Sequence, residues 1–547
     1  MILQKYINLF FRYFPAGTSG FLITLAFPKS NLWIIAFFAL VPWLVSTESM
    51  NRRQFFTSGL VAGLCHYFTL IYWIVPTLNV YGGLNIMLAA ATLILLCLYL
   101  SLYFGLFSWG LSFLNPEYAL TSLVASCLWI SLEYIRAYAF TGFPWGLLGY
   151  SQSANRYFIQ IADITGVYGV SFLVLLVNFL IAAFLMSIKK KKPKKLIFPV
   201  CYTCVFIVLT YVYGYYKIES LGAKLSTADT IVVSLVQGNI RQDLKWDAAF
   251  KSKTIEKYIQ LSKSCDVFKP ELVIWPETAL PFYYGQSHTL SNTVDQCVRD
   301  METNFLFGSP SYLSTGNNIE IYNRAFMLNR FSIVTGTYDK THLVPFGEYV
   351  PFGEHLNFLG KLTAQAGNFN AGEKTFIPLP FNNHKTGVLI CFEILFPCIS
   401  ASFVKNGADI LTTITNDAWF GYTSAAEQHF TISVFRAVEN RRSIARAANT
   451  GISGFIDPVG NILETCPLFR DLTLTVNIPA LTHLSIYTRY GDIFTFGAIV
   501  AICLVFVIKG AKNNFQRKVQ EKKIMRLELK QIIQSVHTKT DKLKEYL

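Results

Sequence analysis

Three side chains that can do chemistry each stand at the end of a short segment that suits a strand. Cys391 ends GVLIC, Glu277 ends IWPE, and Lys340 ends YDK. A free thiol has a pKa near 8.5 and is mostly protonated at neutral pH, so a nucleophilic cysteine needs a base. A carboxylate can serve as that base, and a lysine stabilises a thiolate or an oxyanion. The three residue types together supply what covalent catalysis by a cysteine requires.

Cys391 has two other interpretations, as a packed core cysteine or as half of a disulfide. The segment 217–488 holds five cysteines, Cys265, Cys297, Cys391, Cys398 and Cys466. Because five is odd, at least one of these thiols is unpaired even where disulfides form. Taken singly, a glutamate or a lysine after a strand is usually a solvated surface residue. The combination of all three residue types favours the nucleophile.

The elements that position these residues follow from the hydrophobic pattern of 217–488. Apolar runs predict strands at 230–237, 271–278, 304–310, 322–329, 386–393, 408–417 and 471–478, with a hairpin at 451–463. Helical spacing predicts helices at 247–264, 294–301 and about 425–446. Strands that alternate with helices predict a layered α/β domain.

The rest of the chain has the composition of a membrane protein. The sequence is 52% hydrophobic and 15% charged, against about 25% charged residues in soluble domains. Eight apolar runs predict membrane spans at roughly 8–27, 31–47, 55–75, 84–108, 117–136, 166–187, 196–216 and 490–508. We therefore expect a membrane domain at 1–216 with seven spans, a catalytic domain at 217–488, a C-terminal span at 489–508 and a basic tail at 509–547.

The charge distribution predicts the orientation. Segment 217–488 holds 22 Lys and Arg against 24 Asp and Glu, so the net charge of +14 resides in the membrane flanks and does not indicate a nucleic-acid surface. Basic residues cluster at 52–53, at 187–195 and after 508, which is one side of an eight-span protein. Positive residues mark the cytoplasmic side. We expect the catalytic domain in the periplasm and both termini in the cytoplasm.

These motifs resemble the nitrilase superfamily, and the spans narrow the resemblance to its membrane-bound branch, apolipoprotein N-acyltransferase. The resemblance rests on IWPET, YDKTHLVPFGEYVP, GVLICFE, TNDAWFG (415–421) and RSIARAANTGISGFIDPVG (442–460). In the first half it rests on LAFPKS (25–30), FTGFPWGLLGYSQ (140–152), DITGVYGVSF (163–172) and VQGNIRQDLKW (236–246). It covers residues from about 20 to 508.

The resemblance implies an αββα sandwich and a role for each motif residue. Glu277 would be the general base, Lys340 the oxyanion stabiliser and Cys391 the nucleophile. Glu348 and Glu393 would be supporting carboxylates. Phe392 stands where the family often has tyrosine, and the pocket would be shaped by tryptophans, here Trp246 and Trp419. Trp145, in GFPWG, is expected either in an aromatic belt or at a lipid entrance.

The implied reaction has two half-reactions and needs no metal or organic cofactor. Cys391 attacks a phospholipid ester, and the thioester is then attacked by the N-terminal amine of a diacylglyceryl-cysteine on an apolipoprotein. The partners are a phospholipid donor, a diacylated apolipoprotein acceptor and the bacterial inner membrane. The alternatives are a membrane-anchored amidase or nitrilase that uses water, and a transporter or scaffold with an inactive domain.

Two further segments leave alternatives open. The aromatic-rich stretch 345–369 is either a lid that touches lipid or an ordinarily buried loop. The tail beyond 508 has near-helical apolar spacing among lysines, which suits a basic helix on the inner leaflet or a partner-binding helix. His429 lies on the predicted helix at 425–446, where a core or capping position is expected.

Overall fold

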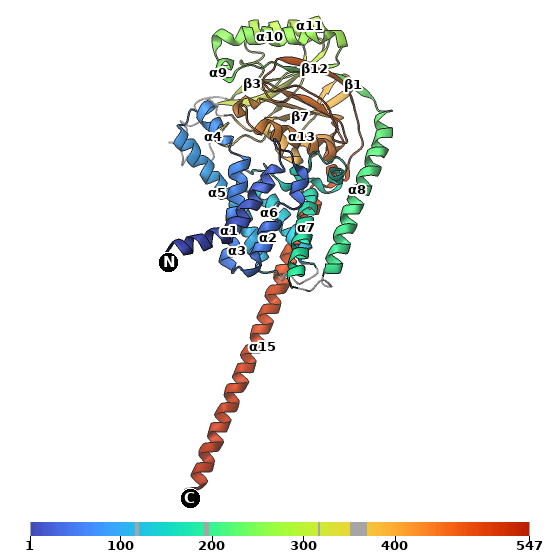
Figure 1. The fold of residues 1–547 in the computed structure, drawn as a ribbon. Coiled ribbons are helices and arrows are strands. Elements are labelled where there is room, and N and C mark those ends of the chain that lie inside the picture. The colour runs from blue at the N-terminus through green and yellow to red at the C-terminus, as the bar shows by residue number, and fades with distance from the viewer. Residues whose placement is uncertain (1, 115–119, 191–195, 316–317, 350–368, 546–547) are drawn as a thin grey trace. The chain divides into compact units, whose positions relative to one another are not determined.

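The structure is a computed structural model that describes residues 2–114, 120–190, 196–315, 318–349 and 369–545. Contacts divide the chain into two compact units, Met1–Thr495 and Phe496–Leu547. The second unit consists mainly of the long helix α15 (Ile493–Glu545), and the first contains all other elements (Figure 1).

Two six-stranded sheets form the α/β part of the first unit. The first sheet has the order β12-β1-β2-β3-β4-β5 and consists of β1 (Thr230–Gln237), β2 (Leu272–Ile274), β3 (Asn304–Thr315), β4 (Asn318–Leu328), β5 (Val334–Asp339) and β12 (Leu472–Pro479). The second has the order β11-β10-β9-β8-β7-β6 and consists of β6 (Leu379–Phe381), β7 (His384–Ile390), β8 (Ile410–Thr415), β9 (Ile444–Ala448), β10 (Gly454–Ile456) and β11 (Ile462–Thr465).

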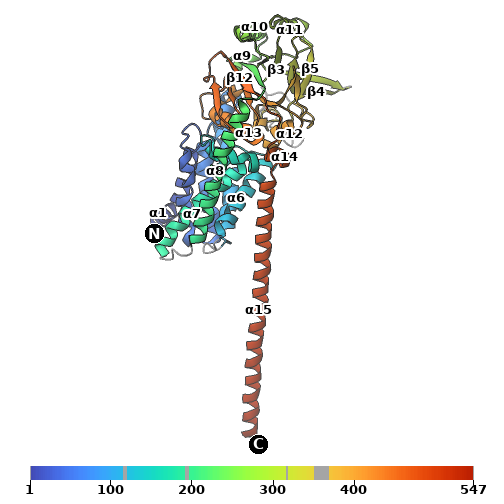
Figure 2. The ribbon, with the colours of Figure 1, turned by 90° about the vertical axis from the view of Figure 1, so that its right-hand side faces the viewer.

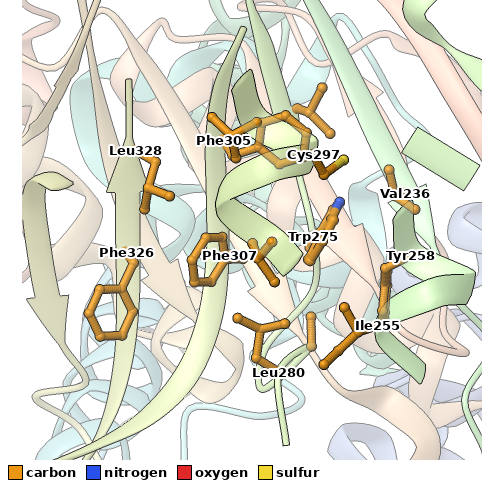
Figure 3. Packing of buried hydrophobic residues seen from close by; sticks show 14 of the residues in the cluster. Val236, Ile255, Tyr258, Trp275, Leu280, Cys297, Phe305, Phe307, Phe326 and Leu328 are labelled. Atoms are coloured by element: carbon orange, nitrogen blue, oxygen red, sulfur yellow. The ribbon is translucent and has the colours of Figure 1, made fainter. Parts of the chain in front are cut away.

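Helices cover the outer face of each sheet. α10 (Lys251–Ser264) and α11 (His288–Met301) lie over the first sheet (Figure 1), and their apolar side chains pack on Trp275, Phe305 and Phe307 (Figure 3). α12 (Pro397–Lys405) and α13 (Ala425–Asn440) pack at the second sheet. The predicted αββα sandwich is confirmed.

Parallel pairing brings the polar strand ends together. β1, β2 and β3 are parallel neighbours, and so are β7, β8 and β9. The carboxyl ends of parallel strands meet at one edge of a sheet. Glu277 therefore follows β2 at an edge of the first sheet, while Cys391 and Asp417 follow β7 and β8 at an edge of the second.

Several elements differ from the sequence prediction, and β2, β3, β4 and α11 differ in their bounds. The helix expected to 446 ends at Asn440, because Arg441 takes a left-handed conformation (φ 53°) and β9 begins at Ile444. The strand expected at 386–393 ends at Ile390. β5, β6 and α12 were not predicted, since their short segments lack a clear period.

The helices before β1 form a bundle beside the sandwich (Figure 2). The longer ones are α1 (Ile2–Leu25), α3 (Arg52–Leu70), α5 (Ile86–Leu111), α6 (Thr121–Tyr138), α7 (Ala162–Lys190) and α8 (Ile197–Leu225). Short helices connect them, namely η1 (Trp33–Phe37), α2 (Val41–Ser46), η2 (Thr47–Ser49), α4 (Ile74–Pro76), η3 (Thr77–Tyr81), η4 (Leu148–Gln152) and η5 (Phe158–Ile161).

The expectation of about eight spans is wrong. Among the described residues four helices are long and apolar enough to cross a membrane, at 86–111, 158–190, 197–225 and 493–536, and a bent pair at 52–81 adds a fifth if it counts as one span. The run at 31–47 breaks into short helices, and six-residue α2 is only about 9 Å long. α6 carries Glu133 and Arg136, and α1 carries Arg12 and Pro15, which lower their apolar character.

α13 connects the helical bundle to the sandwich. Gln428 receives hydrogen bonds from the indole nitrogens of Trp73 (3.3 Å) and Trp145 (2.7 Å), and it donates to the carbonyl oxygens of Pro28 and Leu70. Beyond the end of α13, buried Arg441 pairs with Asp163 at the start of α7 (2.9 Å). Gln428 thus contacts three segments of the bundle, and Arg441 contacts a fourth.

Candidate active site

Cys391 occupies a strained turn at the end of β7. Its φ is +53°, in the left-handed region that costs a non-glycine residue roughly 1–3 kcal/mol and is frequent at functional sites. The residue begins the short helix η10 (Cys391–Leu395) and is partly exposed. It is a free thiol, as predicted, and all eleven cysteines in the described part of the chain are free.

Glu277 lies in the turn after β2, and its carboxylate is buried. One oxygen accepts from the amide of Asn323 at 2.7 Å, and the other accepts from the backbone N–H of Asn416 at 2.9 Å. The next residue, Thr278, also has a positive φ of 44°. A methyl group on Gly308 would lie 2.5 Å from the backbone nitrogen of Thr278, so only glycine lets β3 approach this turn.

Lys340 stands between two carboxylates. It is 1% exposed, and its Nζ lies 2.9 Å from Glu348 and 3.5 Å from Glu277. Glu348 in turn accepts from the backbone N–H of Val344 at 2.8 Å. The structure thus brings Glu277, Lys340 and Glu348, which are separated by up to 71 positions in the sequence, into one buried cluster of the first sheet.

Asn323 is a site residue that the sequence analysis missed. Its side-chain Nδ2 donates to Glu277 at 2.7 Å and to Glu348 at 3.1 Å, and its backbone carbonyl oxygen accepts from the backbone N–H of Lys340. Its Oδ1 is buried without a hydrogen-bond partner in the described structure. Asparagine is depleted in strands, so an asparagine inside the strand expected at 322–329 was the available signal.

Lys245 is a second missed residue, next to the predicted Trp246. It is 2% exposed, and its Nζ donates to the Glu277 carbonyl oxygen (3.1 Å) and to the Thr278 hydroxyl (2.6 Å). Burial lowers the pKa of Lys245 to about 8, although the charges of Glu277 and Cys391 act in the opposite direction. This lysine fixes the turn that carries Glu277.

The thiol of Cys391 is strongly held in its protonated form. Burial, first, and the negative charge of Glu277 raise its pKa, while Lys340 lowers it by less. The sequence predicts that a lysine lowers the thiol pKa. Lys340 does act in that direction, but burial and Glu277 outweigh it, so the pKa of Cys391 is raised. For Lys340 itself, burial opposes the charge, but Glu348 and Glu277 outweigh it and raise the pKa. The raised pKa of Lys340 favours its cationic form, and the raised pKa of Cys391 favours the protonated thiol.

Glu393 joins the cysteine turn to the lysine loop. One oxygen accepts from the Ile390 N–H at 2.9 Å. The other accepts from the backbone and hydroxyl of Thr341 (2.7 and 2.9 Å) and from the hydroxyl of Tyr338 (2.8 Å). The carboxylate is fully buried, which raises its pKa even though these donors act against the shift. Phe392 points elsewhere and packs beside His342 and Phe396.

The three predicted tryptophans lie in different surroundings. Trp246 is 45% exposed, and Trp419 is partly exposed with its ring 5.9 Å from that of Tyr81. Trp145 is only 2% exposed; it packs on Trp73 and stacks on His429 at 5.6 Å. It lies at the contact between the bundle and α13.

A second buried cluster, Asp417, His429 and Arg446, lies on the second sheet's side of Cys391. Arg446 is 2.8 Å from one oxygen of Asp417, and His429 Nδ1 is 3.0 Å from the other. The charge of Asp417 contributes to the raised thiol pKa. For Asp417 itself, burial opposes the charge, but Arg446 and His429 outweigh it and lower the pKa.

Two further points concern the surroundings of the site. Most of the loop expected at 345–369 falls on 350–368, which lies outside the described residues; the described Phe346 is 49% exposed.

Among the described residues, no group of three or more His, Cys, Asp and Glu side chains is arranged to hold a metal ion.

Comparison with known proteins assigns both halves of the chain. Residues 19–180 match the family described as "Apolipoprotein N-acyltransferase N-terminal domain", and residues 232–484 match "Carbon-nitrogen hydrolase". A solved carbon-nitrogen hydrolase from Helicobacter pylori G27 is 16% identical and covers 46% of this chain and 89% of its own, with a TM-score of 0.36.

Two curated relatives cover nearly the whole chain. The apolipoprotein N-acyltransferase of Geobacter metallireducens is 38% identical over 90% of this chain and 94% of its own length. That of Pasteurella multocida is 30% identical over 92% of this chain and 96% of its own. Because the likeness spans the helical bundle as well as the sandwich, this chain belongs to the apolipoprotein N-acyltransferase family.

Proposed function

We propose that this enzyme moves an acyl chain from a phospholipid to the N-terminal amine of a diacylglyceryl-cysteine on an apolipoprotein, through a thioester on Cys391. Its membership of the acyltransferase family supports the overall reaction. The observation that carries the mechanism is that Cys391 is a free thiol whose pKa responds to the charges of Glu277 and Lys340, which lie 3.5 Å apart.

In the first half-reaction, Glu277 removes the thiol proton as Cys391 Sγ attacks the ester carbonyl carbon of the phospholipid. The raised pKa of the thiol makes a base necessary, and Glu277 is the carboxylate that most affects that thiol. Lys340, held cationic by two carboxylates, stabilises the developing oxyanion. Collapse breaks the ester bond, and the proton on Glu277 passes to the departing oxygen, which releases a lysophospholipid.

In the second half-reaction, the α-amine of the acceptor attacks the thioester carbonyl. Glu277 takes a proton from the amine nitrogen, Lys340 again stabilises the oxyanion, and the thiolate leaves as the amide forms. The proton then returns to the sulfur. Glu348 and Asn323 keep Lys340 and Glu277 in place through both steps, and Glu393 holds the turn of Cys391 against the loop of Lys340.

For substrate contact we propose the partly exposed aromatic side chains near the site. Trp246 and Trp419 present ring surface suited to acyl chains. Trp145 and Phe392 are proposed to shape the pocket from behind, because Trp145 is buried against α13 and Phe392 packs on its neighbours.

We propose that residues 1–216 form the membrane domain, 217–488 the catalytic domain in the periplasm, 489–508 a final span and 509–547 a cytoplasmic tail. One end of the bundle is basic: Lys189 and Lys190 at the end of α7 pair with Glu48, close in sequence to Arg52 and Arg53. The opposite ends of α3 and α7 contact α13 of the sandwich, through Leu70 with Gln428 and through Val167 with Glu439. Basic residues favour the cytoplasm, which supports a periplasmic sandwich.

The test follows acyl transfer directly. The full-length protein is incubated with a phospholipid of defined acyl composition and analysed by mass spectrometry, and a diacylated lipopeptide is then added. We expect one acyl chain on Cys391, none in Cys391→Ala, and transfer of that chain to the lipopeptide amine. Release of free fatty acid in place of transfer would favour the amidase alternative. That alternative is less supported, because residues 19–180 match the acyltransferase family.

A further inference from the structure

Lys340 and Cys391 belong to different sheets, so their relative position depends on contacts between the two segments that carry them. Lys340 follows β5 of the first sheet, and Cys391 follows β7 of the second. One such contact is made by Glu393, whose carboxylate accepts from the backbone N–H of Ile390 (2.9 Å) and from that of His342 (3.2 Å). This carboxylate joins the two main chains.

The ring of His342 makes a second contact between the same two segments. His342 stands two residues after Lys340, and the centroid of its ring lies 3.7 Å from that of Phe396 and 5.9 Å from that of Phe392. The rings of Phe392 and Phe396 lie 5.5 Å apart. Phe392 directly follows the nucleophile, and Phe396 follows the last residue of η10. The histidine therefore packs against both ends of the short helix that begins with Cys391.

The His342 ring packs as an uncharged aromatic group. Burial, first, and then the charges of Lys340 and Lys374 lower the pKa of His342 to about 4, although the backbone of Thr141 acts in the opposite direction. The ring is therefore neutral near pH 7. Aromatic rings that meet at an angle attract one another, so the contact with the two phenylalanines needs no charge on the histidine.

Phe396 is also packed against the helical bundle. It is 3% exposed, and a methyl group on Gly142 would lie 3.3 Å from its ring. Gly142 has a φ of 80° and lies in the segment between α6 and η4 that also carries Trp145. Because the bundle and the sandwich enclose Phe396, its ring gives His342 a fixed surface to pack against.

We propose that His342 is a positioning residue, whose contact with the two phenylalanines keeps Lys340 Nζ at the place where the oxyanion forms beside Cys391. The inference rests on the proposed function in one respect, the roles of Lys340 and Cys391. The oxyanion develops on the carbonyl group that the sulfur attacks, so the placement of the lysine relative to the sulfur determines how well the charge is stabilised. A misplacement of about 1 Å by a residue outside the chemistry can cost about 10²-fold in rate.

Two substitutions separate the ring of His342 from its polar atoms. His342→Phe keeps an aromatic ring and loses both nitrogens, whereas His342→Gln keeps a polar amide and loses the ring. Acyl-enzyme formation is followed by mass spectrometry of the full-length protein, in a single turnover, over a range of phospholipid concentrations. The maximal rate should fall about 10–100-fold in His342→Gln and stay within about fivefold of the unsubstituted protein in His342→Phe. The half-saturating phospholipid concentration should change by less than about threefold in both variants.

Alkylation by iodoacetamide gives a second readout, because it needs the thiolate of Cys391 but forms no oxyanion. Its rate in His342→Gln should stay within about threefold of the unsubstituted protein, while acylation falls by more. His384→Gln and His384→Phe are the controls. This histidine also lies 5.9 Å from a phenylalanine ring, that of Phe381, but at the opposite end of β7. Neither control should change the rate of acylation or of alkylation.

Equal acylation rates in the two His342 variants, or faster acylation in His342→Gln than in His342→Phe, would overturn the proposal, since the ring would then have no part in the rate. Equal losses of acylation and alkylation would also overturn it, because the substitution would then act on the thiol and not through Lys340. If His342→Gln does not fold, His342→Leu takes its place, with the same loss expected. Absence of an acyl group on Cys391 in the unsubstituted protein is a different result, which refutes the proposed function.

Discussion

Two buried ion clusters flank Cys391, and they differ in how their atoms are paired. In the cluster of the first sheet, Glu277 and Glu348 share Lys340 and Asn323, so two carboxylates compete for one cation. In the cluster of the second sheet, Asp417 has one cation of its own, Arg446, and further donors in Thr415 and His429. In the first cluster the carboxylates outnumber the cation that they contact, and in the second one carboxylate contacts one cation.

This difference in pairing suits the first cluster to proton transfer and the second to holding the structure in place. A group that must accept and return a proton needs a carboxylate that is incompletely compensated, as Glu277 is at 3.5 Å from its cation. A group that must keep its position needs a carboxylate that never protonates near neutral pH, as the lowered pKa of Asp417 ensures. Substitutions in the first cluster should therefore reduce the rate, and those in the second should mainly reduce stability.

The largest effect is expected for Glu277→Gln. Acyl-enzyme formation should slow by about 10²–10⁴, the usual share of general-base catalysis. Alkylation of Cys391 by iodoacetamide at fixed pH should instead become faster, because loss of the Glu277 charge lowers the thiol pKa. Both rates are read by mass spectrometry at residue 391. Glu271→Gln, just before the same strand, is the control; parallel changes in the two rates would contradict the assignment of Glu277 as base.

Lys340→Met should come next, with acylation slower by about 10²–10³. The substitution leaves Glu277 and Glu348 facing each other without their cation, so the free energy of unfolding should also fall by about 3–5 kcal/mol. Stability is measured by denaturant unfolding, with the exposed Lys385→Met as control. Adding Glu348→Gln should recover stability without recovering the rate. If the double variant regained the rate, Lys340 would not be the oxyanion stabiliser.

Asp417→Asn should show the reverse pattern. Arg446 loses its buried partner, which should cost about 3–5 kcal/mol of stability, while the folded fraction acylates within about tenfold of the unsubstituted rate. Asp409→Asn, on the segment before β8, provides the control. A loss of rate as large as that of Glu277→Gln, without loss of stability, would break the distinction between the clusters.

The smallest effect concerns the pH dependence at Lys245. Its pKa of about 8 in the fold lies below the ordinary value of 10.5, so between these pH values the unfolded chain holds a proton that the folded chain has lost. Stability from this group therefore rises with pH across about 8 to 10.5, by at most about 3 kcal/mol.

Lys245→Met should remove that rise, which is measured as the difference in unfolding free energy between the two proteins at each pH. The difference removes the contribution of every titrating group that does not interact with Lys245, and it keeps those of Lys245 and of its coupled neighbours Glu277 and Cys391. Lys253→Met, on the exposed side of α10, should leave the curve unchanged. Curves of the same shape with and without Lys245 would show that the buried amine does not titrate in this range.

The fold was predictable where a residue's surroundings are local. β1 was predicted to the residue, since six of its eight residues are apolar or β-branched and such a run has few other conformations. The expected helix to 446 failed because IARAA in β9 is equally compatible with a buried helix, and only its pairing between β8 and β10 decides for a strand. The eight expected spans failed because apolar runs such as 31–47 bend into short helices against their neighbours.

By itself, the sequence determined that Glu277, Lys340 and Cys391 each follow a strand or an apolar run, and that these residue types suit a cysteine nucleophile. Only the tertiary structure decided that Asn323 bridges two carboxylates and that Lys245 reaches the turn of Glu277 from 32 positions away. The tertiary structure also decided that the pKa of the Cys391 thiol is raised and not lowered. Strand ends are set by neighbours in the chain, whereas burial and charge at a site depend on the distances between segments that only folding brings together.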